Sequence, residues 1–192
     1  GHNHDHEGHD HGDEEHHHHD IAGDPHFWLD ANRMASVATA VGDLLAQADS
    51  AHADDYKERA EKVAGDMKAL ASEMESGLKQ CKQDTFIVSH KAFGYLAQNT
   101  GLHQVGVSGI DPEVAPSPER LKTIGEVVKE TGTKVIFTEV NVSPKVIEVL
   151  ADDLGIETSV LDPIETLNDP SENYASLMKT NLENLRKGLD CQ

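Results

Sequence analysis

The chain has 192 residues and a formal net charge of −19 at pH 7. A surface this acidic repels nucleic acid and anionic lipid and concentrates cations, so we expect no nucleic-acid partner. No run of 18 or more apolar residues occurs, so the sequence predicts no membrane-spanning helix. The chain opens at Gly1 with neither an initiating Met nor a signal peptide, and we expect an internal fragment or a processed product.

The first twenty residues hold nine His, seven Asp or Glu, three Gly and one Asn, without an apolar side chain. Such a segment buries nothing that offsets the entropy of ordering it, so residues 1–22 are predicted to be a flexible, disordered loop. Clustered imidazoles bind zinc, copper, nickel and cobalt. A purification tag and a linker that binds metal incidentally are the alternatives. The candidate accessory ligands are His2, His4, His6, His9, His11, His16, His17, His18 and His19.

Residues 23–83 are predicted to form a linker and a long helix. Apolar side chains recur with a period near 3.6 residues from Asp30 to Ala48, at Met34, Val37, Val41, Leu44 and Leu45, which indicates a helix. A second helix is predicted from Asp54 to Lys79, and at 1.5 Å per residue it would be about 40 Å long.

Residues 84–192 alternate short apolar runs with helical patterns. Strands are predicted at 85–88, 104–107, 134–138 and 157–161, and helices at 91–99, 116–132, 143–155 and 174–189. This order predicts an α/β fold with a parallel sheet of about four strands and helices on both faces. In such sheets ligands bind beyond the carboxyl ends of the strands.

Potential metal ligands stand where that binding edge is expected. His90, Glu139 and Asp162 each follow a predicted strand, and His26 directly precedes the first helix. A single histidine at a strand end is more often a hydrogen-bonded structural residue than a ligand. Three such positions together with His26 favour a site, and a neutral His pair with a carboxylate suits zinc.

The remaining chemistry of the sequence is sparse. Cys81 and Cys191 are the only cysteines and form no CxxC motif, so they do not make a thiolate metal site, and whether they pair is left open. There is no Ser/His/Asp order, no phosphate loop and no HExxH motif, so we expect no enzyme. A hydrolase with a catalytic zinc, in which Glu139 could serve as the base, is a further rival hypothesis.

Five short pieces of sequence occur together in one order. They are DPHFWLD (24–30), VSHKAFGYL (88–96), GIDPE (109–113), FTE (137–139) and LDP (161–163). In this order, and after a His-rich segment, they resemble the metal-binding solute-binding proteins of ABC transporters, specifically the zinc branch of cluster A-I. The resemblance covers residues 24–165, and the last helix fits it too.

The resemblance implies two α/β lobes joined by a rigid backbone helix, with one metal held between the lobes. The helix 54–79 would be that backbone, and 84–192 the C-terminal metal-binding lobe; the N-terminal lobe, with its histidine, is missing. His26 and His90 would be metal ligands, Asp162 would occupy the C-terminal-lobe ligand position, and Glu139 would orient the site. His90, where manganese members more often carry Glu, favours zinc.

The resemblance further implies a function without catalysis. The chain would bind zinc with high affinity as the extracytoplasmic component of a metal uptake system and deliver it to a cognate ABC permease in the membrane. Its location would be periplasmic or extracellular, with a membrane-anchored lipoprotein as one form. A metal-dependent surface adhesin on the same fold and a manganese-binding member are the alternatives.

Overall fold

The computed structural model of the protein describes residues 22–192. The flexible loop and the histidine ligands predicted within residues 1–21 therefore lie outside the described residues. No helix within the described range is both long and apolar enough to cross a membrane.

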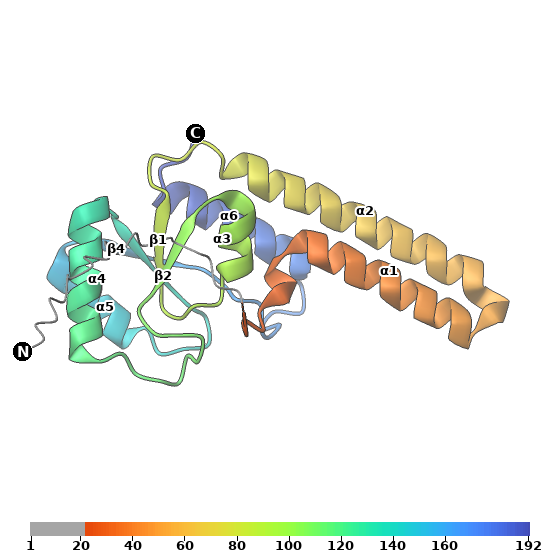
Figure 1. Ribbon diagram of the computed structural model, residues 1–192, viewed down its shortest axis with the longest axis horizontal. Helices are drawn as coiled ribbons and strands as arrows, with labels where there is room; N and C mark the ends of the chain where they lie inside the picture. Colours follow the sequence, from red (N-terminus) through yellow and green to blue (C-terminus); the bar gives the residue numbers. More distant parts are fainter. Residues whose placement is uncertain (1–21) are drawn as a thin grey trace, which may run out of the picture.

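A parallel sheet forms the centre of the fold (Figure 1). Its strands stand in the order β2-β1-β3-β4, and every neighbouring pair is parallel. The chain runs from β1 outward to β2 and then returns to β3 on the other side of β1, so the connections diverge between β1 and β3. Ligands bind at such a switch point, outside the carboxyl ends of the strands. The strands are β1 (Thr85–Val88), β2 (His103–Gly106), β3 (Val135–Thr138) and β4 (Glu157–Val160).

Helices cover both faces of this sheet, because the strand side chains alternate between two apolar clusters. Phe86 and Val88 point into the first cluster, and Ile87 between them points into the second. The predicted α/β fold is thus confirmed. The first cluster is completed by α3 (Gly94–Thr100), α6 (Tyr174–Gly188) and the C-terminal part of α2 (Ala53–Gly77), and the second by α4 (Pro118–Thr131) and α5 (Lys145–Leu154).

The helix α1 (Ala31–Ala48) pairs with α2 in a hairpin that extends away from the sheet (Figure 1). Two short 3-10 turns, η1 (Phe27–Leu29) and η2 (Ser50–His52), flank α1. The Asp30 carboxylate caps α1 by accepting hydrogen bonds from the backbone N–H groups of Asn32 and Arg33. This cap explains why the helix begins where the segment 24–30 ends.

The buried face of α1 differs from its apolar stripe. Periodicity predicted the helix correctly, yet the large apolar side chains Val37, Val41, Leu44 and Leu45 are between 37% and 64% exposed. The buried residues of α1 are small instead, and the absence of a side chain at Gly42 allows α1 and α2 to approach closely. These buried residues are Ala31, Ala35, Gly42 and Ala46.

The helix α2 contacts the sheet only through its second half. Leu70 and Met74 join the first apolar cluster, as does Leu78 just beyond the helix, whereas Val63 is 46% exposed. One helix therefore supports both the hairpin and the α/β layer. The division of the chain into a linker (23–83) and a lobe (84–192) remains a prediction.

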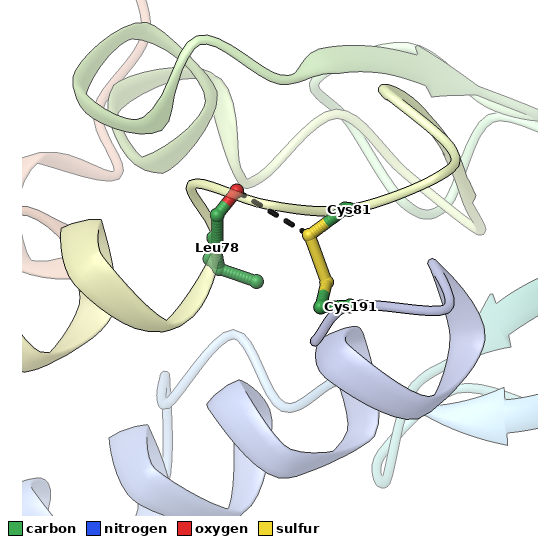
Figure 2. The surroundings of a disulfide bond; sticks show 3 residues. All are labelled: Leu78, Cys81 and Cys191. Carbon is green, nitrogen blue, oxygen red and sulfur yellow. Dashed lines mark hydrogen bonds between the residues drawn. A yellow bond between two sulfur atoms is a disulfide. The ribbon is translucent and has the colours of Figure 1, made fainter.

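A disulfide joins Cys81, which follows α2, to Cys191 near the C-terminus, so the two cysteines whose pairing was left open are bonded. Figure 1 shows the C-terminus beside the end of α2 that lies away from the hairpin tip. Figure 2 shows the disulfide joining the segment after α2 to the C-terminus, with the Leu78 carbonyl oxygen 3.3 Å from the Cys81 sulfur. The two cysteines lie 110 residues apart. A cross-link over such a loop stabilises by about 4–5 kcal/mol in the chain-entropy model.

The close approach of α1 and α2 gives a test with one substitution at two positions. A Cβ added at Gly42 would lie 2.3 Å from the Ala60 Cβ, whereas one at Gly65 would meet nothing within 4 Å. Gly42→Ala should lower the free energy of unfolding by about 1–3 kcal/mol through overpacking. Gly65→Ala should raise it by about 0.5–1 kcal/mol through better helix propensity. Urea denaturation measures both, and equal signs would contradict the packing described.

Candidate metal centre

His26 lies in the segment that leads into α1 and is 3% exposed. Both its backbone N–H and its ring Nδ1 contact Asp24 Oδ1, at 2.9 and 2.7 Å. Asp24 is held in turn, since the Tyr95 hydroxyl donates to its carbonyl oxygen at 3.1 Å. Leu29, three residues on, is buried in the first apolar cluster. The His26 ring is thus fixed by a buried carboxylate on a segment anchored to the sheet layer.

His90 follows β1 at the carboxyl edge of the sheet and is 1% exposed. Glu139 follows β3, the neighbouring strand, and its Oε1 accepts from the Ser89 hydroxyl, from the backbone N–H of His90 at 3.2 Å and from His90 Nδ1 at 2.5 Å. The parallel pairing of β1 with β3 therefore brings together two residues that are 49 positions apart.

The two carboxylates determine which ring nitrogens remain available. An ionised carboxylate only accepts hydrogen bonds, so Nδ1 is the donor in both the Asp24–His26 pair and the Glu139–His90 pair. Each imidazole then presents the lone pair of Nε2. The two Nε2 atoms face each other at 3.4 Å. This carboxylate–imidazole arrangement is typical of metal-bound histidines.

Glu165 supplies a third donor atom. Its Oε1 lies 3.3 Å from His26 Nε2 and 3.8 Å from His90 Nε2. Among the described residues, these three form the group whose donor atoms all lie within 4.8 Å of one another. Zinc bonds of about 2.0–2.1 Å at tetrahedral angles separate ligand atoms by roughly 3.3–3.4 Å. The His26–His90 and His26–Glu165 separations match this spacing, and the His90–Glu165 separation of 3.8 Å is longer, so a small shift of the Glu165 side chain would complete a tetrahedral set.

Asp162, the predicted ligand in this loop, lies outside the cluster. Its Oδ1 accepts from the backbone N–H of Ile164 at 2.8 Å, and its own backbone N–H and carbonyl bond the Asn181 side chain at 2.8 and 2.7 Å. Ile164 takes a left-handed conformation with φ of 54°. The chain therefore turns sharply after β4, and this turn directs Glu165 rather than Asp162 toward the histidines.

This turn is the reason that the sequence pattern alone favoured Asp162. Asp162 is the first acidic residue beyond the strand, and Glu165 follows it three residues later, beyond Pro163. A left-handed β-branched residue costs on the order of 1–3 kcal/mol and is not expected from sequence. Glu139 and Asp24, both nearly buried, contact Nδ1 atoms and not the Nε2 atoms that face Glu165.

Comparisons with known proteins were consistent with this chemistry. The family model described as "Zinc-uptake complex component A periplasmic" matches residues 1–188. The zinc-binding protein AdcA of Streptococcus pyogenes serotype M3 is 35% identical over 198 residues, which cover 99% of this chain and 38% of that protein. The chain thus spans little more than a third of this relative.

Solved structures extend the similarity to the fold. The laminin-binding protein Lmb of Streptococcus agalactiae, described as having adhesin and metal transporting activity, superposes with a TM-score of 0.79 at 38% identity, over 86% of this chain and 65% of that one. A Zn(II)-bound variant of AdcAII from Streptococcus pneumoniae gives 0.78 at 35% identity, over 86% and 61%. The chain belongs to the family of the periplasmic component A of zinc-uptake complexes.

Proposed function

We propose that the chain binds one Zn²⁺ ion as cargo, through His26 Nε2, His90 Nε2 and a carboxylate oxygen of Glu165. The observation that carries this proposal is the convergence of the three donor atoms at separations of 3.3 to 3.8 Å. Two imidazoles and one carboxylate are a common zinc set. The fourth position would be taken by water, by a histidine of the 1–20 tract or by a donor on another chain or lobe.

We further propose that the bound ion is handed to an ABC permease. The family consists of solute-binding components of zinc uptake, and its relatives carry names such as zinc-binding protein and zinc-binding lipoprotein. We place the protein in the periplasm or outside the cell. The disulfide between Cys81 and Cys191 supports this location, because disulfides persist in oxidising compartments.

Adhesion is the second candidate function, and one observation favours it. Lmb, which superposes on this chain, is described as both an adhesin and a metal transporter. Binding to immobilised laminin that is unchanged by metal removal or by loss of the histidines would support an adhesive surface separate from the metal centre. Absence of laminin binding by the folded chain would leave zinc delivery as the sole candidate.

The zinc ligands are tested in the tract-silent chain, a full-length protein in which the nine histidines of residues 1–19 are replaced by Asn. Glu165→Gln keeps the side-chain size but removes the anionic donor, and should weaken zinc binding by about 10–100-fold. Removing only a residue that hydrogen-bonds to a metal ligand already costs that much, so the loss of a ligand should cost no less. His26→Ala and His90→Ala should weaken it by at least as much. Competition with a chelating zinc indicator measures the affinity.

The matched control is Glu130→Gln, which makes the same change of charge on an exposed residue of α4, away from the centre. It should leave zinc affinity unchanged within about twofold, since distant surface charges are screened. Equal affinities of the Glu165→Gln and Glu130→Gln variants would remove Glu165 from the ligand set.

The role of Asp162 is tested by a second pair of variants. Asp162→Asn keeps the Oδ1 acceptor for the Ile164 N–H, so the turn should be preserved. Zinc affinity should then change by no more than about threefold, because the only loss is one negative charge that solvent screens from the ion. Asp162→Ala removes the acceptor and should lower the free energy of unfolding by about 1 kcal/mol as well as weaken zinc binding. If Asp162→Asn weakened zinc binding as strongly as Glu165→Gln does, Asp162 would be a direct ligand.

A further inference from the structure

The Glu165 carboxylate has little to hold it except the metal centre. The side chain is 40% exposed, and its polar contacts in the described part of the chain are with the two imidazoles. An exposed, rotatable carboxylate binds metal tightly only if its backbone is already in place, because otherwise binding must order the loop. The position of Glu165 therefore depends on what fixes the turn at residues 162–165.

Two hydrogen bonds hold residues 163 and 164 of that turn. Asp162 Oδ1 accepts from the Ile164 N–H within the loop, at 2.8 Å. Trp28 Nε1 donates to the Pro163 carbonyl oxygen, also at 2.8 Å, across 135 residues of sequence. Asn181 of α6 also bonds the backbone of Asp162 at the start of the turn, at 2.8 and 2.7 Å, whereas the Trp28 bond is the one that ties the turn to the segment carrying His26.

Trp28 is itself secured. The Tyr174 hydroxyl donates to the Trp28 carbonyl oxygen at 2.6 Å, and burial raises the pKa of that hydroxyl, so it remains a donor. The indole ring also packs beside the His26 ring, with the ring centroids 5.3 Å apart. Trp28 thus contacts the proposed ligand His26 through its ring. Its N–H holds the backbone at Pro163, two residues before the proposed ligand Glu165.

We infer that Trp28 is a positioning residue for zinc binding: its indole N–H, by holding the Pro163 carbonyl, keeps the left-handed turn at Ile164 closed and the Glu165 carboxylate within reach of His26 and His90. This inference rests on the proposed zinc function. Trp28, the single tryptophan of the chain, would then contribute to zinc affinity beyond the effect of its packing. The indole N–H should affect zinc affinity only when residue 165 is a ligand.

A double-mutant cycle separates this role from simple packing. The four proteins are the tract-silent chain, its Trp28→Phe variant, its Glu165→Gln variant and the double variant. Phe keeps an aromatic ring against His26 but lacks the N–H. With Glu165 present, Trp28→Phe should weaken zinc binding by about 3–10-fold, the range for one buried hydrogen bond. With Gln at position 165 the loss should fall to within about twofold.

A benzothienylalanine at position 28 provides a second variant that keeps the size and shape of the indole while replacing N–H by sulfur, so it removes the hydrogen bond without opening a cavity. Thr100→Val is the matched control, because it likewise deletes a half-buried side-chain donor to backbone carbonyl oxygens, those of Leu96 and Ala97, on α3 away from the turn. The benzothienyl protein should behave as Trp28→Phe does, and the Thr100→Val protein should bind zinc as the parent does.

Hydrogen exchange on the metal-free chain gives a readout that does not depend on zinc. The Ile164 amide should exchange faster in the Trp28→Phe and benzothienyl proteins and at the parental rate in Thr100→Val. Equal loss of affinity in both residue-165 backgrounds, or unchanged affinity and exchange, would overturn the positioning role. If Glu165→Gln by itself left zinc affinity unchanged, the proposed ligand set would be refuted. The exchange rate of the Ile164 amide would then still test whether Trp28 holds the turn.

Discussion

The pairing of each site histidine with its own buried carboxylate is the constraint on which the centre depends. Asp24 and Glu139 occupy the Nδ1 atoms of His26 and His90, and the two Nε2 atoms are left facing each other at 3.4 Å. Lone pairs at that distance repel one another unless a cation or a proton lies between them. With the Glu165 oxygen close by, the arrangement is complementary to a small divalent cation.

The topology of the sheet makes these pairings possible. The switch between β1 and β3 places the ends of two adjacent strands side by side, so that Ser89, His90 and Glu139 meet there. The segment 24–30 crosses to the same edge before α1 begins, anchored by Leu29 in the core and by the Tyr95 hydroxyl. The loop after β4 completes the centre, and Trp28 joins that loop to the segment.

The sequence predicted the parts of this arrangement that depend on local pattern. Strand and helix positions followed from apolar periodicity, and His90 and Glu139 were placed at strand ends because parallel strands present their carboxyl termini at one edge. Two features were not predicted. The exposed apolar stripe of α1 reflects close packing against α2 at Gly42 and its small neighbours, and the approach of Glu165 rather than Asp162 to the histidines follows the left-handed turn at Ile164.

The central claim is that one zinc ion is held by two imidazoles and one carboxylate of this chain. Zinc X-ray absorption on the tract-silent chain, loaded with one equivalent of Zn²⁺, tests it most directly. The account predicts nitrogen or oxygen ligands at about 2.0–2.1 Å, with the multiple-scattering signature of two imidazole rings that disappears in the His26→Ala, His90→Ala double variant. A spectrum without imidazole scattering, or one that the double variant leaves unchanged, would contradict it.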